Sequence, residues 1–118
     1  MLIRLGVVAL AALVVGCGGS GGGYGTGPTP PPPPANTVDA TPAEAFTPAS
    51  ITVTAGTTVS FAFGSLGHNV FFDAVAGAPA DIAGTNANTT ITRVFNTAGT
   101  FTYTCHIHPN MHGTVVVN

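Results

Sequence analysis

Charged side chains are scarce in this 118-residue sequence, and lysine is absent from it. Its two basic residues, Arg4 and Arg93, stand against four acidic residues. Proteins that bind nucleic acids rely on a cationic surface that neutralises phosphates. The composition therefore argues against a nucleic-acid partner.

Helical periodicity is also lacking, and apolar residues instead alternate with polar ones in segments 50–55, 58–63 and 100–106. Alternation at period two, with Thr-rich polar faces and Gly-containing turns between the segments, is typical of half-buried antiparallel strands. We therefore predict an all-β fold, an antiparallel sandwich or barrel. The inward-facing positions are predicted to be Ile51, Val53, Ala55, Val59, Phe61, Phe63, Phe101, Tyr103 and Cys105.

Other segments are less clear in pattern. Residues 69–75 and 113–118 are apolar on both faces and are predicted to be interior strands. Segment 90–95 is ambiguous, because Arg93 has the same parity as its apolar neighbours. The Ala- and Gly-rich segment 74–88 is expected to be a loop with room for one helical turn.

The N-terminal segment has the pattern of an export signal. Arg4 precedes an apolar run at 5–15 that is too short to span a bilayer. The sequence VVGC, ending at Cys17, resembles the lipobox of bacterial lipoproteins, which implies cleavage before Cys17 and attachment of lipid to its thiol. We predict a signal peptide at 1–16 and a chain exported to the periplasmic or cell-surface side, anchored to the membrane. The alternative is an ordinary signal peptide with an incidental cysteine.

A low-complexity segment follows the signal. Seven of the ten residues at 18–27 are glycine, and residues 30–34 are consecutive prolines. Glycine-rich chain is flexible, and a proline run favours stiff polyproline II. We predict a tether over 17–35 and one folded domain over 36–118.

The chain has two cysteines, Cys17 and Cys105. In an exported protein the two thiols could form one disulfide. If Cys17 carries lipid, however, Cys105 has no partner. Metal ligation would then explain why a lone thiol is kept in an oxidising compartment.

Metal-binding side chains are concentrated in TYTCHIHPNMHG, residues 102–113, which contains three of the four histidines. By strand parity Cys105 faces the core and His106 points the opposite way. The donors that can converge are then spaced Cys105-x-x-His108-x-x-Met111. The fourth donor is predicted to be His68, which follows a Gly-rich turn.

Two imidazoles, one thiolate and one thioether form a soft, mixed donor set. A His₂Cys site with a weak axial Met is typical of blue copper electron-transfer centres. Zinc would accept the cysteine and both histidines, but structural zinc sites usually take another Cys or His as the fourth ligand. A structural zinc domain remains the alternative.

The motifs GHNVFFD and FNTAGTFTYTCHIHPNM resemble the ligand segments of small cupredoxins of the plastocyanin and amicyanin type. The resemblance covers about residues 46–117. It implies an antiparallel Greek-key β-sandwich with one copper ion at one end, bound by His68, Cys105, His108 and Met111.

The resemblance also assigns roles around the copper. Asn69 is expected to support the ligands, with its backbone N–H on the Cys105 sulfur and its side chain joining the two ligand segments; a plain turn Asn is the alternative. His106 and His112 are not assigned to the metal.

The predicted function is transport of single electrons by a monomer that docks redox partners at the His108 edge, without enzymatic activity. A copper-storage lipoprotein is the alternative. Segments 64–67 and 109–113, expected to surround His108, contain no Asp, Glu, Lys or Arg. We therefore expect an uncharged docking surface and electron-transfer rates that depend little on salt.

Overall fold

The computed structural model describes residues 35–118, so the predicted signal peptide, the predicted lipidation site Cys17 and nearly all of the predicted tether lie outside the described residues. Within 35–118 the chain forms nine β-strands, and no helix there is long and apolar enough to cross a membrane. The strands are β1 (Thr37–Thr41), β2 (Ala45–Thr47), β3 (Ser50–Val53), β4 (Thr57–Phe63), β5 (His68–Phe72), β6 (Ile82–Asn86), β7 (Thr89–Phe95), β8 (Gly99–Thr104) and β9 (His112–Val117).

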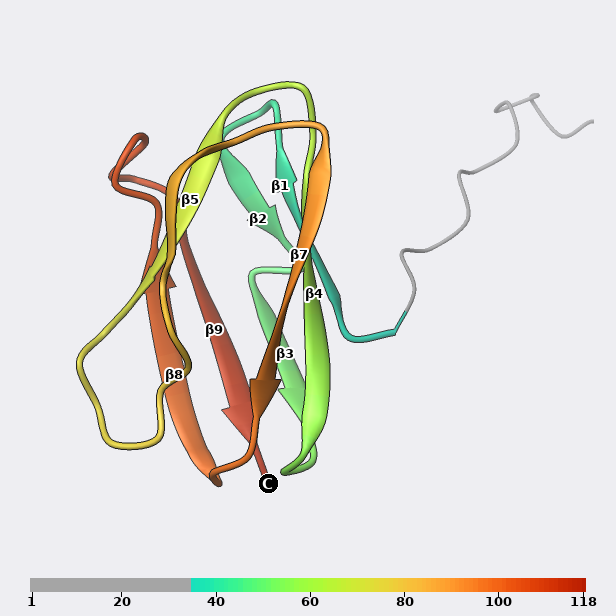
Figure 1. The fold of residues 1–118 in the computed structure, drawn as a ribbon, viewed down its shortest axis with the longest axis vertical. Coiled ribbons are helices and arrows are strands. Elements are labelled where there is room, and N and C mark those ends of the chain that lie inside the picture. Colours follow the sequence, from blue (N-terminus) through green and yellow to red (C-terminus); the bar gives the residue numbers. More distant parts are fainter. Residues whose placement is uncertain (1–34) are drawn as a thin grey trace, which may run out of the picture. The chain divides into compact units, whose positions relative to one another are not determined.

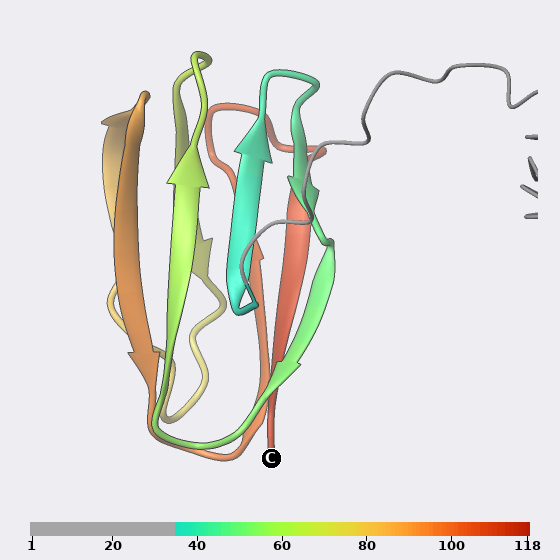
Figure 2. The same ribbon diagram turned by 90° about the vertical axis from the view of Figure 1, so that its right-hand side faces the viewer.

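The strands form two sheets that face each other (Figures 1 and 2), in the orders β2-β1-β4-β7 and β3-β9-β8-β5-β6. This confirms the predicted all-β sandwich. The sheets are not wholly antiparallel as predicted but mixed, because β1 pairs with β4 and β3 pairs with β9 in parallel. Parallel neighbours cannot be joined by a short hairpin. Here the chain leaves one sheet after β2, runs through β3 in the other and returns as β4.

The core lies between the sheets and is built from the alternating positions. The side chains of β4 and β8 that were predicted to face inward are buried: Val59, Phe61, Phe63, Phe101 and Tyr103. The Phe61 and Tyr103 rings meet edge to face, with centroids 5.4 Å apart. Such contacts join the two sheets through their largest side chains.

Three short strands were not predicted. β1 and β2 are too short for alternation to stand out, and β6 lies in the segment expected to be a loop. Only Ile82 is buried in β6, and Gly84 has a positive φ of 80°. The pairing of β6 with β5 also shifts register, so the sequence of β6 shows no regular alternation of apolar and polar residues.

The ambiguous segment 90–95 lies within β7, which is an edge strand. Arg93 keeps the parity of Phe95, yet its guanidinium reaches the loop before β6 and donates hydrogen bonds to the carbonyls of Ala80 and Asp81. An edge position lets a charged side chain escape from the inner face of a sheet. Arg93 therefore stabilises the loop before β6 and does not occupy the core.

Three connections meet at one end of the sandwich in both views (Figures 1 and 2): the β1–β2 turn, the β4–β5 connection and the β8–β9 loop. The C-terminus lies at the opposite end. His68 follows the second of these connections, and Cys105, His108 and Met111 belong to the third. The fold thus gathers all four predicted donors at one end.

Candidate metal centre

Three donor atoms converge where β5 begins and β8 ends. The Nδ1 atoms of His68 and His108 are 3.0 Å apart, and the Cys105 Sγ lies 3.9 Å from each of them. Cys105 is fully buried and makes no disulfide within residues 35–118. Strand parity therefore places the thiol correctly, on the inner face and beside both imidazoles.

These separations fit a single metal ion. Bonds from a first-row ion such as zinc are about 2.0–2.1 Å to imidazole nitrogen and about 2.3 Å to thiolate sulfur. Each observed separation is shorter than the sum of the two bonds it would have to span. One ion can therefore contact all three donors without moving the backbone.

The imidazole of His68 is held in place by the last residue of β1, Thr41. Its Nε2–H donates to the Thr41 carbonyl at 2.9 Å, which leaves Nδ1 as the nitrogen with a free lone pair. The Asn86 amide donates to the His68 carbonyl. Gly67 allows this packing, because a Cβ at that position would overlap Thr85. The side chain of His68 is fully buried.

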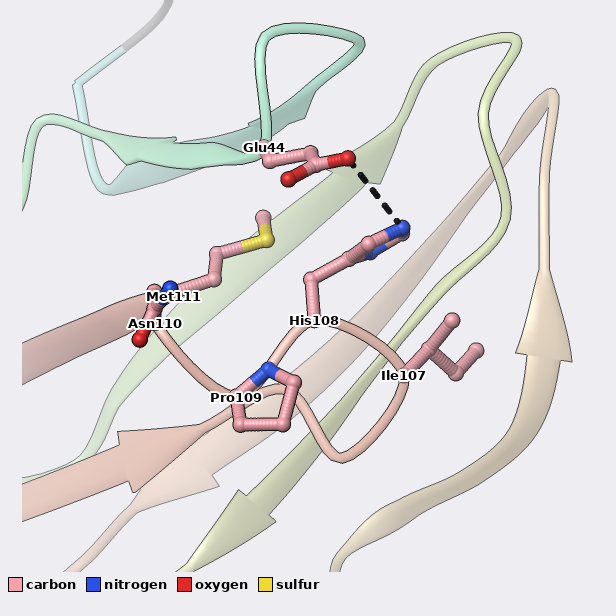
Figure 3. A pocket seen from close by; sticks show the side chains of 6 residues that line it. All are labelled: Glu44, Ile107, His108, Pro109, Asn110 and Met111. Carbon is pink, nitrogen blue, oxygen red and sulfur yellow. Dashed lines mark ion pairs between the residues drawn. The ribbon is translucent and has the colours of Figure 1, made fainter.

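The ligand loop between β8 and β9 is closed by its own backbone. The Cys105 N–H donates to the Met111 carbonyl at 3.0 Å, and the Met111 N–H donates to the His108 carbonyl at 2.9 Å. Met111 is only 1 % exposed, and Figure 3 shows its side chain extending to the same side of the loop as the His108 ring. The buried thioether completes the donor set of a type 1 copper site.

His108 is the donor nearest to the surface, with 19 % of its side chain exposed. Its Nε2 lies 3.6 Å from Oε1 of Glu44, which belongs to the β1–β2 turn (Figure 3). The expectation of an uncharged surface around His108 is therefore wrong. It considered segments 64–67 and 109–113, whereas Glu44 approaches from the β1–β2 turn, and no sequence pattern connects that turn with His108.

Asn69 is a buried residue of β5 that reaches two other segments. Its side-chain carbonyl accepts a hydrogen bond of 2.7 Å from the His106 N–H, and its amide donates to the Gly84 carbonyl. The side chain thus joins β5 to the ligand loop, in keeping with the expected role rather than with a plain turn. The proposed bond from its backbone to the Cys105 sulfur stays a prediction.

The other two histidines lie on the outside of the same sheet. His106 is exposed and stacks on Phe71, with ring centroids 3.9 Å apart and planes 5° from parallel. His112 Nδ1 lies 3.1 Å from the Thr104 hydroxyl. Neither belongs to the cluster of converging donors. This arrangement agrees with leaving both unassigned.

Gly113 belongs to β9, just after the ligand loop. It pairs with Tyr103 on β8, and a Cβ on Gly113 would collide with that ring. Burial raises the pKa of the Tyr103 hydroxyl above its usual range. The Tyr103 ring therefore fills the space that a side chain at Gly113 would occupy, next to the ligand loop.

Comparison with known proteins agrees with this site. The family model "Copper binding proteins, plastocyanin/azurin family" matches residues 35–118. Plastocyanin from Dryopteris crassirhizoma is 36 % identical over 88 residues, which cover 61 % of this chain and 86 % of plastocyanin.

Solved structures show the same likeness. The oxidised form of that plastocyanin superposes with a TM-score of 0.58 at 32 % identity. The match covers 70 % of this chain and 99 % of the plastocyanin chain. A reduced amicyanin variant superposes with a TM-score of 0.60 at 30 % identity. The match covers 70 % of this chain and 80 % of the amicyanin chain. A copper-containing nitrite reductase from Thermus scotoductus, 24 % identical, shares the fold over 22 % of its length. With its donor geometry, its fold and its matched residues in agreement, this chain belongs to the plastocyanin/azurin family of copper-binding proteins.

Proposed function

We propose that this blue copper protein carries single electrons between redox partners at the cell envelope, anchored to the membrane by lipid on Cys17. One observation carries the electron-transfer part. His68, Cys105 and His108 converge within 4.8 Å of one another, and of these three only His108 reaches the surface. A buried site with one exposed ligand edge suits the passage of electrons more than the entry of a substrate.

Copper, when bound, supplies a one-electron couple between Cu(II) and Cu(I). The chain would hold the donors in one arrangement for both states: the Thr41 carbonyl fixes the His68 ring through Nε2, and the hydrogen bond from Cys105 to Met111 closes the ligand loop. Donors that are already in place need little rearrangement when the charge changes. The His108 ring then offers the short route between the site and a docked partner.

Spectroscopy tests the copper site. Addition of Cu(II) to the purified protein should produce an intense visible thiolate-to-copper band, and Cys105→Ser should abolish that band while far-UV circular dichroism shows an intact β fold. Absence of the band in the wild-type protein would contradict the proposal.

Electron exchange separates transport from storage. The copper-loaded protein should be reduced and reoxidised reversibly by small redox complexes, faster than a chelator removes the metal. A coloured protein that loses copper before it exchanges electrons would instead be a copper-storage protein.

Membrane anchoring needs its own experiment, because it rests on the sequence around Cys17 alone. Wild-type protein expressed in a bacterium should fractionate with membranes and carry lipid detectable by mass spectrometry. Cys17→Ser should prevent lipid attachment. Unmodified wild-type chain in the soluble exported fraction would refute the anchor and leave the copper site untouched.

A further inference from the structure

A small pocket lies beside the exposed edge of His108. Its volume is about 160 Å³, and Figure 3 shows the six residues that line it: Glu44, Ile107, His108, Pro109, Asn110 and Met111. Sites for whole small molecules usually measure about 300–1,000 Å³, whereas one water occupies about 30 Å³. The pocket is therefore sized for a single side chain.

Glu44 is held at this pocket by an unusual backbone. Its φ is 57°, in the left-handed region that Glu rarely adopts, and its N–H donates to the Thr41 carbonyl across the turn. Asn and Gly occupy this conformation at lower cost, and such strain often marks a functional position. The turn thus directs a carboxylate towards the edge of His108 at an energetic cost.

Among residues 35–118 no Arg or Lys side chain pairs with Glu44, whose carboxylate faces the His108 imidazole. Arg93, the one Arg or Lys of that segment, donates its hydrogen bonds to the carbonyls near β6. Asp73 and Asp81, in contrast, accept hydrogen bonds from the Thr102 hydroxyl and the Phe72 N–H. Glu44 is 59 % exposed, with one carboxylate oxygen facing His108 (Figure 3).

We infer that this pocket receives an Arg or Lys side chain of the redox partner, which pairs with Glu44 while apolar groups of the partner pack on Ile107 and Pro109. The inference rests on the proposed electron-transfer function and adds the chemistry of the partner. Ile107 is 40 % exposed and offers the apolar contact. The charge pair selects cationic partners and sets their register against the His108 edge.

The test uses the full chain, copper-loaded and reduced, as an electron donor to two small oxidants of opposite charge. The cationic oxidant is tris(phenanthroline)cobalt(III) and the anionic one is hexacyanoferrate(III); each takes one electron, leaving Co(II) or Fe(II). Glu44→Gln should slow the cationic reaction about fivefold at low salt and accelerate the anionic one, and Glu44→Lys should extend both changes. The matched control is Asp39→Asn, which removes the same charge from a different pocket.

A second measurement locates the bound cation without electron transfer. Hexaamminechromium(III), which is paramagnetic and redox-inert, should broaden the amide signals of Glu44, Ile107 and Asn110 in the reduced protein, and Glu44→Gln should remove that broadening. Equal rate effects of Glu44→Gln and Asp39→Asn, or broadening centred on another face, would overturn the inference. The visible copper band, recorded on the same samples after they are oxidised to Cu(II), reports on the copper site of the proposed function separately, so that either can fail alone.

Discussion

The two histidines whose Nδ1 atoms face each other lie in contrasting surroundings. His68 belongs to β5, is fully buried and donates from Nε2 to a backbone carbonyl. His108 belongs to a loop, is partly exposed and has a carboxylate near Nε2. A carbonyl in the core cannot move or be titrated, whereas a side chain at the surface can respond to a partner.

The difference indicates a division of labour between the two regions. The β5 region fixes the geometry of the donors, and the ligand loop connects them with the outside. Substitutions should therefore have consequences of different kinds on the two sides, even where both residues bind the same ion.

The largest effect is expected from deleting either imidazole. His68→Gly and His108→Gly should both lose the visible copper band, but imidazole added to the solution should restore it only in His108→Gly. The space left by His108 adjoins the open pocket of Figure 3, whereas the space left by His68 is enclosed. Titration of the absorbance with imidazole measures the recovery. Equal recovery in both variants would remove the contrast.

A smaller effect is expected from uncoupling the two regions at Asn69. Asn69→Ala leaves the His106 N–H and the Gly84 carbonyl without their partner in two partly buried hydrogen bonds, and it empties the buried place of the Asn69 side chain. The free energy of unfolding should fall by about 2–3 kcal/mol. Chemical denaturation measures it, and the copper band should shift in wavelength because the loop is released from β5. A variant with unchanged stability and an unchanged band would show that this link is dispensable.

Rigidity of the β5 side can be probed at Gly67. Gly67→Ala should destabilise the protein by about 1–3 kcal/mol, because the new Cβ overlaps the Thr85 methyl group. Thr85→Ser removes that methyl and should restore most of the loss in the double variant, as measured by thermal unfolding. On the loop side, Asn110→Ala is the control and should change stability by less than about 0.5 kcal/mol. Failure of the double variant to recover would contradict the packing explanation.

The smallest effects are expected on the outside of the sheet. His106→Ala should leave the copper band unchanged and cost about 1 kcal/mol through loss of the stack on Phe71. His112→Ala should be milder still, since it loses one contact with Thr104 at an exposed position. For both variants, visible absorbance measures the copper band and chemical denaturation measures the free energy of unfolding. Loss of colour in either variant would move that histidine into the metal site.

The features that could be predicted from the sequence are the core positions and donor side chains whose direction follows from the local alternation of a strand. Alternation placed Phe61 and Tyr103 in the core, and the same parity turned Cys105 inward and His106 outward. Because strand geometry fixes which side chains share a face, the donor spacing in the loop was readable once the strand was recognised.

The remaining features depend on contacts between distant segments. Glu44 and Thr41 reach the two imidazoles only because the β1–β2 turn folds over that end of the sandwich. The parallel pairing of β3 with β9 likewise arises from a passage between sheets that leaves no pattern in either strand. Gly113 clears space for Tyr103, a partner ten positions earlier on the neighbouring strand, and no local pattern around the glycine indicates this.

The hydrogen bond from the Cys105 N–H to the Met111 carbonyl has a consequence for how such a protein can change over evolution. It joins the first and last residues of the ligand loop, so it holds the ends of β8 and β9 together whatever residues lie between them. Inside the loop, His106 is also tied to β5 through Asn69 and Phe71. We therefore expect residues 107, 109 and 110 to be exchangeable over evolution with little effect on the register of β8 and β9.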